Sequence, residues 1–171
     1  MLRLRALALA TILAVAAPLS GSAQQPAAPA VAPPPVTPYG TPIGIEAAKK
    51  AMAASEAEAR KNNWPMAIAI LDSTGHMVMF QKLDNTQHGS IAVAVDKAQT
   101  AVDFRRPSKV FEDLVAGGGV GLRVLGIRGV SPLEGGVPIV ANGTVIGAIG
   151  VSGGTSQQDA QVARAGADAV K

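Results

Sequence analysis

Two adjacent residues near the end of the chain, Asn142 and Gly143, constrain the fold more than any other feature. They separate two apolar, β-branched runs at residues 137–141 and 144–151. Asn-Gly between such runs predicts a type I′ β-hairpin, because this turn needs positive φ at both central residues. The second run and its continuation contain four small residues: Gly147, Ala148, Gly150 and Gly153. Because glycine weakens a strand, these positions indicate close approach by a packed helix or, alternatively, by a ligand.

The first 23 residues have the pattern of a secretory signal peptide, which gives a predicted segment 1–23. Arg3 and Arg5 precede an apolar run that ends near residue 19, and small residues follow at 20–23. The run is too short to span a bilayer comfortably, so we expect no stable membrane span after cleavage and a periplasmic or secreted protein. Residues 24–40 are rich in proline and alanine and are interpreted as a linker. Residues 41–171 then fit one domain.

Composition excludes several classes of function. The chain has no cysteine, which excludes disulfides, thiolate metal sites and cysteine nucleophiles. The formal net charge of +3 falls to about +1 once Arg3 and Arg5 leave with the signal peptide. Aromatic residues make up 3% of the chain, too few for a platform on which bases stack. Nucleic-acid binding is therefore not expected.

Hydrophobic periodicity indicates the order of the remaining elements. It predicts helices at residues 45–62, 91–104, 109–115 and 157–170, and strands at 66–71, 77–82 and 122–127 in addition to the hairpin. Ser90, Ser108 and either Thr155 or Ser156 are the expected N-caps of the last three helices. Tight turns between neighbouring strands indicate an antiparallel sheet with segregated helices, which is the α+β class.

The methionines are interpreted as core residues rather than as ligands, because strand periodicity already accounts for them. Met66 opens the first predicted strand. In the strand at 77–82, regular alternation places Met77 and Met79 on one face and Val78 and Phe80 on the other.

Three stretches, residues 56–85, 89–115 and 134–166, resemble the GlcG/HbpS-type haem-binding family, also called haem-degrading domains. The last stretch, which begins EGGVPIVANGTVIGAIGVSGG, is the most specific. The C-terminal domain of PduO-type cobalamin adenosyltransferases is similar to the same family. The resemblance implies a profilin-like α+β fold, with an antiparallel sheet of about five strands flanked by helices. It also implies a homo-oligomer that binds haem or another tetrapyrrole such as a corrinoid.

The two histidines are the candidate iron ligands, since imidazole is a common axial ligand of haem. His88 lies in a loop just before a predicted helix, where its ring could face a bound porphyrin, and the alternative is an exposed histidine without a role. His76 follows the turn at 72–75, so we expect it to face solvent.

Charged residues beside small ones supply the other candidates. Lys97 lies among alanines on a predicted helix, and Glu134 begins the EGG turn at a position that matches the family. With haem as the ligand, Lys97 and Arg106 are expected to hold carboxylates such as the propionates, and Glu134 is expected beside them. With a small acidic or aromatic metabolite, Lys97 and Glu134 would act as acid and base of an enzyme. A structural Lys97–Glu134 ion pair is the alternative for these two residues.

The sequence is therefore compatible with three functions. The first is a secreted or periplasmic, oligomeric haem-binding protein that serves as a carrier, a scavenger or a sensor partner. The second is the metabolite enzyme that uses Lys97 and Glu134. The third is a structural or interaction module, which the small-residue helix at 91–104 also permits because alanines allow close contact between subunits.

Overall fold

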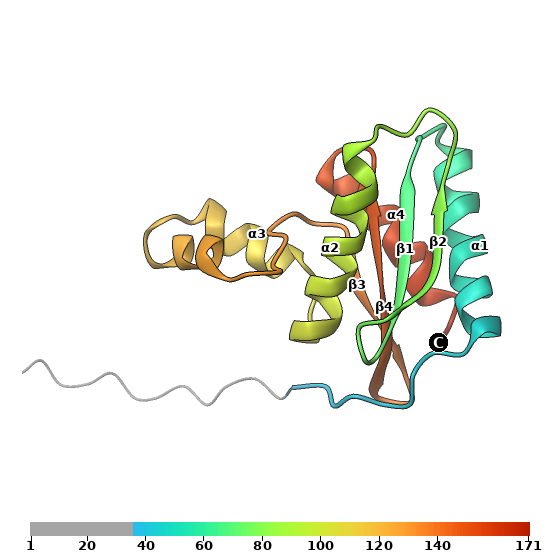
Figure 1. The fold of residues 1–171 in the computed structure, drawn as a ribbon, viewed down its shortest axis with the longest axis horizontal. Coiled ribbons are helices and arrows are strands. Elements are labelled where there is room, and N and C mark those ends of the chain that lie inside the picture. The colour runs from blue at the N-terminus through green and yellow to red at the C-terminus, as the bar shows by residue number, and fades with distance from the viewer. Residues whose placement is uncertain (1–35) are drawn as a thin grey trace, which may run out of the picture. The chain divides into compact units, whose positions relative to one another are not determined.

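The computed structural model describes residues 36–171, so the predicted signal peptide and most of the predicted linker lie outside the described residues. Figure 1 shows the order of the elements. They are α1 (Ile45–Lys61), β1 (Ala67–Asp72), β2 (Met77–Lys82), α2 (Gly89–Phe104), α3 (Lys109–Ala116), the 3₁₀ helix η1 (Gly119–Gly126), β3 (Gly136–Ala141), β4 (Thr144–Ser152) and α4 (Ser156–Asp168). Among these residues, no helix combines the length and the apolar composition needed to cross a bilayer.

The described strands form one sheet with the order β2-β1-β4-β3, in which every pair of neighbours is antiparallel. The predicted α+β class is confirmed, with four strands rather than about five. The predicted strand at 122–127 is the difference, because most of it belongs to η1. η1 packs closely on α3 instead of extending along the sheet, since a Cβ on Gly121 would lie 1.9 Å from the carbonyl oxygen of Leu114.

The predicted Asn-Gly hairpin is confirmed, but only its second strand, β4, is central, because β3 lies at the edge of the sheet. Asn142 and Gly143 have φ values of 49° and 73°, as a type I′ turn requires. β4 pairs with both β1 and β3. A Cβ on Gly150 would lie 2.0 Å from the carbonyl oxygen of Ala94 in α2. Of the two interpretations of the small residues, the packed helix is therefore correct at Gly150.

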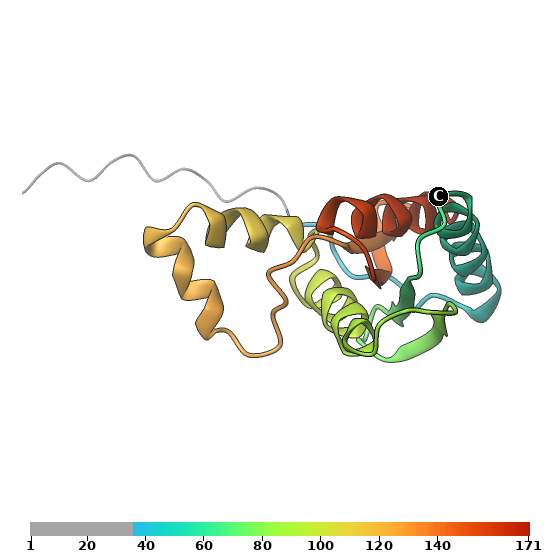
Figure 2. The ribbon, with the colours of Figure 1, turned by 90° about the horizontal axis from the view of Figure 1, so that it is seen from above.

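Helices cover both faces of the sheet (Figures 1 and 2). α1 and α4 lie side by side on one face, and α2 lies on the other. The face under α1 and α4 is packed with larger side chains, including Met66, Ile68, Ile70 and Ile149. The face under α2 is packed mainly with alanine and valine, including Ala69, Ala94, Ala98 and Val145. The small residues let the axis of α2 approach the strands closely.

A β-bulge changes which side chains of β2 share a face. Met79 pairs with Ile70, but Met77 pairs with Leu71, so Val78 is the extra residue. Val78 and Met79 both pack on the α1/α4 side, whereas Met77 joins Phe80 on the α2 side, where their partners Leu71 and Ala69 lie. The prediction from regular alternation is therefore wrong. Met66 and Met79 are core residues as predicted, but Met77 is exposed.

The helix caps match the predictions only in part. Thr155 caps α4 through a capping box with Gln158, as predicted. α2 begins earlier than expected, with His88 at the N-cap and Ser90 inside the first turn. Ser108 is the N-cap of α3, but its side chain makes no capping bond. Its hydroxyl instead donates to the carbonyl of Leu133 at 2.6 Å and accepts from the N–H of Gly136 at 2.9 Å.

The last residues of the predicted linker belong to the folded part of the chain. Tyr39 forms an isolated parallel bridge with Val145, and its hydroxyl donates to the carbonyl of Val102 at 2.8 Å. The guanidinium of Arg105 lies 4.9 Å from the centre of the tyrosine ring. The domain boundary therefore falls before residue 41.

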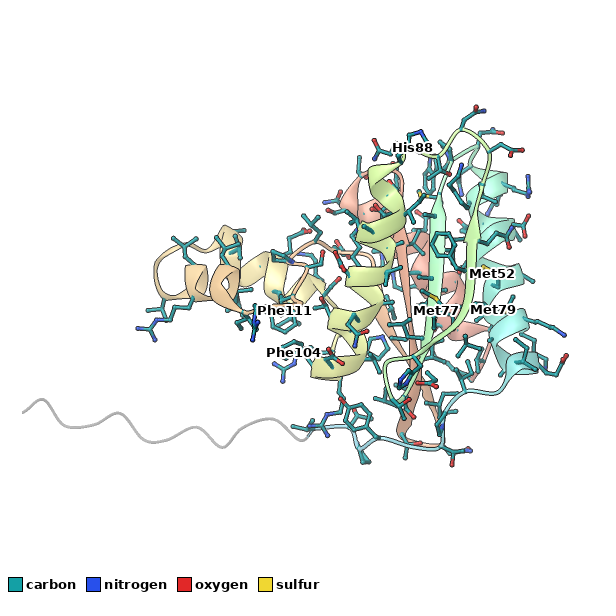
Figure 3. All side chains as sticks on the ribbon, in the orientation of Figure 1. Met52, Met77, Met79, His88, Phe104 and Phe111 are labelled. Atoms are coloured by element: carbon teal, nitrogen blue, oxygen red, sulfur yellow. The ribbon has the colours of Figure 1, made fainter. Side chains whose placement is uncertain are left out.

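α3 and η1 extend away from the sheet as an arm, defined here as residues 109–126 (Figures 1 and 2). The base of the arm is fixed by Ser108 and by an edge-to-face contact between Phe104 and Phe111, whose ring centres are 4.9 Å apart (Figure 3). Beyond the base, the arm exposes large apolar side chains: Val110, Leu114, Val120, Leu122 and Leu125.

Candidate functional site

An exposed apolar surface of the sheet layer lies between β2 and α2. We call it the β2–α2 face and define it by Met77 and Phe80 on β2 and Ile91 and Val95 on α2. Met77, Phe80 and Ile91 are 46%, 39% and 37% exposed, and Val95 is half-buried. Singly exposed apolar residues are common, but neighbouring ones indicate a binding surface.

The position of α2 over the sheet explains this surface. α2 packs on β4, β1 and β3, which leaves the outer strand β2 uncovered on that side. Ile91, Val95 and Gln99 follow one another at four-residue spacing and so form one stripe along the helix. Gln99 lies against the β1–β2 turn, since a Cβ on Gly75 would be 2.8 Å from its Nε2. The stripe therefore borders β2.

His88 lies at one end of this surface. It is the N-cap of α2, its side chain is exposed, and Figure 3 shows it where the loop from β2 joins the helix. Its ring has no hydrogen-bond partner among residues 36–171. His76 differs, because its Nδ1 lies 2.8 Å from the Thr74 hydroxyl in the β1–β2 turn. Both ring nitrogens of His88 are therefore free to bind a ligand, whereas His76 has only Nε2 free and lies in the β1–β2 turn, away from this end of α2.

Lys97 lies deep between α2, β4 and α4. It is only 1% exposed, and its Nζ lies 2.6 Å from Oδ2 of Asp159 and 3.1 Å from the carbonyl oxygen of Val151. Burial raises the pKa of Asp159, while the ammonium of Lys97 and the backbone N–H groups of Gly154 and Gly153 oppose this rise. The arrangement is a buried ion pair rather than a group open to a ligand.

Glu134 has a different partner. Its Oε1 accepts a hydrogen bond from Nη1 of Arg164 at 3.2 Å, so the Lys97–Glu134 ion pair that was the alternative for these residues does not form. The two residues are nevertheless neighbours, because a Cβ on Gly135 would lie 2.9 Å from Nζ of Lys97. Lys97 and Glu134 thus lie close together, but Lys97 pairs with Asp159 and Glu134 pairs with Arg164. This pairing does not support their joint use as acid and base.

Arg106 lies apart from His88. It follows the C-terminal end of α2, is exposed, and donates from Nε to the carbonyl of Phe104. The 16 residues of α2 rise by about 24 Å between His88 and this end. The four residues predicted to bind haem, His88, Lys97, Arg106 and Glu134, therefore do not converge on one site.

Sequence reasoning missed Asp159, Arg164 and the β2–α2 face. Asp159 and Arg164 both lie on α4, five residues apart, but nothing local in the sequence says that they meet Lys97 and Glu134. The β2–α2 face includes Met77 only because of the β-bulge, and no residue pattern in β2 predicts this bulge. Exposure of Phe80 and Ile91 follows only once the strand order is known.

The described residues also line two cavities. One, of about 320 Å³, lies where α1 meets the sheet and is lined by Arg60, Asn63, Trp64, Pro65, Leu83, Asp84 and Asn85. The other, of about 250 Å³, lies at the base of the arm. Within the described residues, no three His, Cys, Asp or Glu side chains gather closely enough to hold a metal ion.

The four-stranded antiparallel sheet with helices on both faces makes this an α+β domain. The family model described as "Haem degrading protein HbpS-like" matches residues 43–168, and the chain belongs to this family. Protein GlcG of Escherichia coli K12 is 40% identical over 110 residues, which are 64% of this chain and 81% of GlcG.

Solved structures agree with this assignment. A double mutant of HbpS from Streptomyces reticuli is 31% identical with a TM-score of 0.71, over 85% of this chain and 98% of that chain. A PduOC:heme complex is 24% identical with a TM-score of 0.69, over 77% of this chain and 96% of that chain, and this likeness shows the fold alone.

Proposed function

We propose that this protein binds haem on the β2–α2 face, with His88 as the candidate iron ligand. The observation that carries the proposal is the exposed imidazole of His88 at the end of an uncovered apolar surface. Membership of a family described as haem-degrading supports the ligand class.

The residues of this surface fit the chemistry of a porphyrin. Its ring is broad and apolar, and Phe80 and Ile91 supply apolar contact while Met77 adds a polarisable thioether. A neutral imidazole binds haem iron through a ring nitrogen. Lys82 is exposed and pairs with Ala67, which places it on the same side of the sheet, where its ammonium is suited to a propionate. Lys82 thus takes the role that was expected of Lys97 and Arg106.

Titration of the purified chain with haemin, followed by the Soret band, tests the proposal. We expect saturable binding, a weaker and spectrally altered complex for His88→Ala, and no change for the matched control His76→Ala. Phe80→Glu should weaken binding without altering the spectrum of the complex that still forms. Equal binding and identical spectra for His88→Ala and the unaltered chain would refute the ligand assignment.

We further propose that the protein is exported and acts as a carrier, a scavenger or a sensor partner. Support comes from the sequence pattern of residues 1–23, with the apolar run after Arg3 and Arg5. Fractionation of producing cells, with N-terminal sequencing of the product, tests it. We expect a chain that begins near Gln24 outside the cytoplasm, and an uncleaved cytoplasmic chain would contradict the proposal.

A homo-oligomer is part of the same proposal. The exposed apolar side chains of the arm support it, since contiguous apolar surface on a projecting element favours association. The arm also carries both signs of charge, with Glu112 and Asp113 on α3 and Arg123 on η1. Two arms packed around a two-fold axis can therefore bring acid against base as well as leucine against leucine.

A further inference from the structure

The cavity at the base of the arm combines apolar walls with three charged side chains, of which Glu134 and Arg164 form an ion pair. It has a volume of about 250 Å³, and its apolar walls come from four residues: Pro107, Val110, Val137 and Ala160. Glu134 and Arg164 line it together with Lys109 at the rim, where Lys109 is paired with Asp113. A cavity of this size lies just below the range of about 300–1,000 Å³ typical of drug-sized ligands, so it suits a smaller molecule.

The position of Glu134 is fixed by the two glycines that follow it. Gly135 has a φ of 127°, and a Cβ there would lie 2.8 Å from the carbonyl oxygen of Val151. A Cβ on Gly136 would lie 2.1 Å from the carbonyl oxygen of Lys97. The N–H of Glu134 also donates to Oε2 of Glu112 at 2.6 Å. The EGG turn therefore holds this carboxylate firmly beside the cavity.

The Glu134 carboxylate is largely buried yet has spare hydrogen-bonding capacity. Its side chain is 9% exposed, and within residues 36–171 its only hydrogen bond is the one from Arg164 to Oε1. No side-chain oxygen or nitrogen of the described residues is both fully buried and unpartnered, so Oε2 remains accessible. The Arg164 side chain is 55% exposed and uses one guanidinium nitrogen in this contact, which leaves further donors.

The adjacent charges of Glu134 and Arg164 determine which charges a ligand of this cavity must carry. The two groups are 3.2 Å apart, so a ligand charge that reaches one of them also lies near the other. A lone carboxylate beside Arg164 is repelled by Glu134, and a lone ammonium beside Glu134 is repelled by Arg164. A molecule that carries both charges on neighbouring atoms satisfies both residues and keeps its apolar part against the walls.

We propose that this cavity binds a small α-amino acid with an aliphatic side chain. The ligand carboxylate accepts from the guanidinium of Arg164, the ligand ammonium donates to Oε2 of Glu134, and the side chain contacts Val110 and Val137. This site lies apart from the β2–α2 face and does not depend on haem binding.

Isothermal titration calorimetry of the purified chain with three matched probes tests the proposal. The probes are L-valine, 3-methylbutanoate, which lacks the ammonium, and isobutylamine, which lacks the carboxylate. We expect L-valine to bind about 10-fold or more tightly than either, since each charged hydrogen bond contributes about 1.5–3 kcal/mol. Equal affinity for all three probes, or no binding of L-valine at millimolar concentration, would overturn it.

Variants separate this site from a general effect on folding. Arg164→Gln and Glu134→Gln should each weaken L-valine binding by about 10-fold or more. The Arg164 side chain is half exposed, so its replacement should leave the fold intact even if the Glu134 variant is unstable. Arg60→Gln, which removes a comparable surface ion pair with Glu56 on α1, is the control and should bind normally. Unchanged binding by Arg164→Gln would contradict the proposal.

Discussion

At the scale of single residues, the Lys97–Asp159 ion pair is the most consequential interaction in the described part of the chain. Both side chains are buried, so either one without the other leaves a charge with no partner. We expect Lys97→Met alone to lower the free energy of unfolding by about 3–5 kcal/mol. The double variant Lys97→Met with Asp159→Leu should lose less, because no buried charge remains. Urea denaturation measures both, and a double variant no more stable than the single one would contradict this.

The sequence indicated only half of this pair. Lys97 is recognisable as a charge within a small-residue helix, and a buried lysine needs a partner. The partner, Asp159, is 62 residues away on α4. Glu134 is also close to Lys97 in the fold, since a Cβ on Gly135 would lie 2.9 Å from Nζ, so the sequence could not show which of the two acids pairs with Lys97. Lys97 was identifiable from its chemistry, whereas its pairing with Asp159 is a property of the packed structure.

Asp72 provides a prediction about pH. Partial burial by itself raises its pKa, but hydrogen bonds from the Thr74 hydroxyl and from the N–H groups of His76 and Thr74 outweigh this, and the net pKa is lowered. A lowered pKa means that the carboxylate stabilises the fold fully above its unfolded pKa of about 3.9 and loses this effect as pH falls through the folded pKa. Acid titration of stability should therefore be shallower for Asp72→Asn.

At the scale of elements, the packing of α2 on β4 depends on the absence of a side chain at Gly150. An added Cβ would lie 2.0 Å from the carbonyl oxygen of Ala94, so the helix would have to move. We expect Gly150→Ala to destabilise the protein by about 1–3 kcal/mol, as overpacking of a core does. Gly89→Ala is the control, because an added Cβ meets nothing within 4 Å at the start of α2. Equal unfolding midpoints for the two variants would contradict the close packing.

The elements themselves were largely predictable, and the exceptions have local causes. The Asn-Gly turn and the periodicity of α1 are short-range signals, and both gave correct elements. The segment at 122–127 has a strand-like composition, yet most of it belongs to η1, which packs on α3 rather than on the sheet. In β2, one extra residue at the bulge moves Met77 to the other face, which is why the candidate binding surface was not foreseen.

At the scale of the whole molecule, the sheet layer and the arm offer two separate apolar surfaces, and each is assigned a different role. The β2–α2 face belongs to the outer strand and α2, and is assigned to haem. The arm begins after α2, and self-association is the role that we propose for it. His88 and Arg106 mark opposite ends of α2, so the two roles are separated by the length of that helix. Two functions on distinct surfaces can be removed independently.

This independence gives a reciprocal prediction. Leu125→Glu on the arm should shift the sedimentation coefficient towards that of the monomer, because a carboxylate cannot be buried between apolar side chains without a large penalty. The same variant should keep the haem affinity of the unaltered chain. Phe80→Glu on the β2–α2 face should show the converse, with weaker haem binding and unchanged sedimentation. Loss of haem binding in Leu125→Glu would show instead that association builds the haem site, because a surface confined to one subunit cannot respond to a charge on the arm.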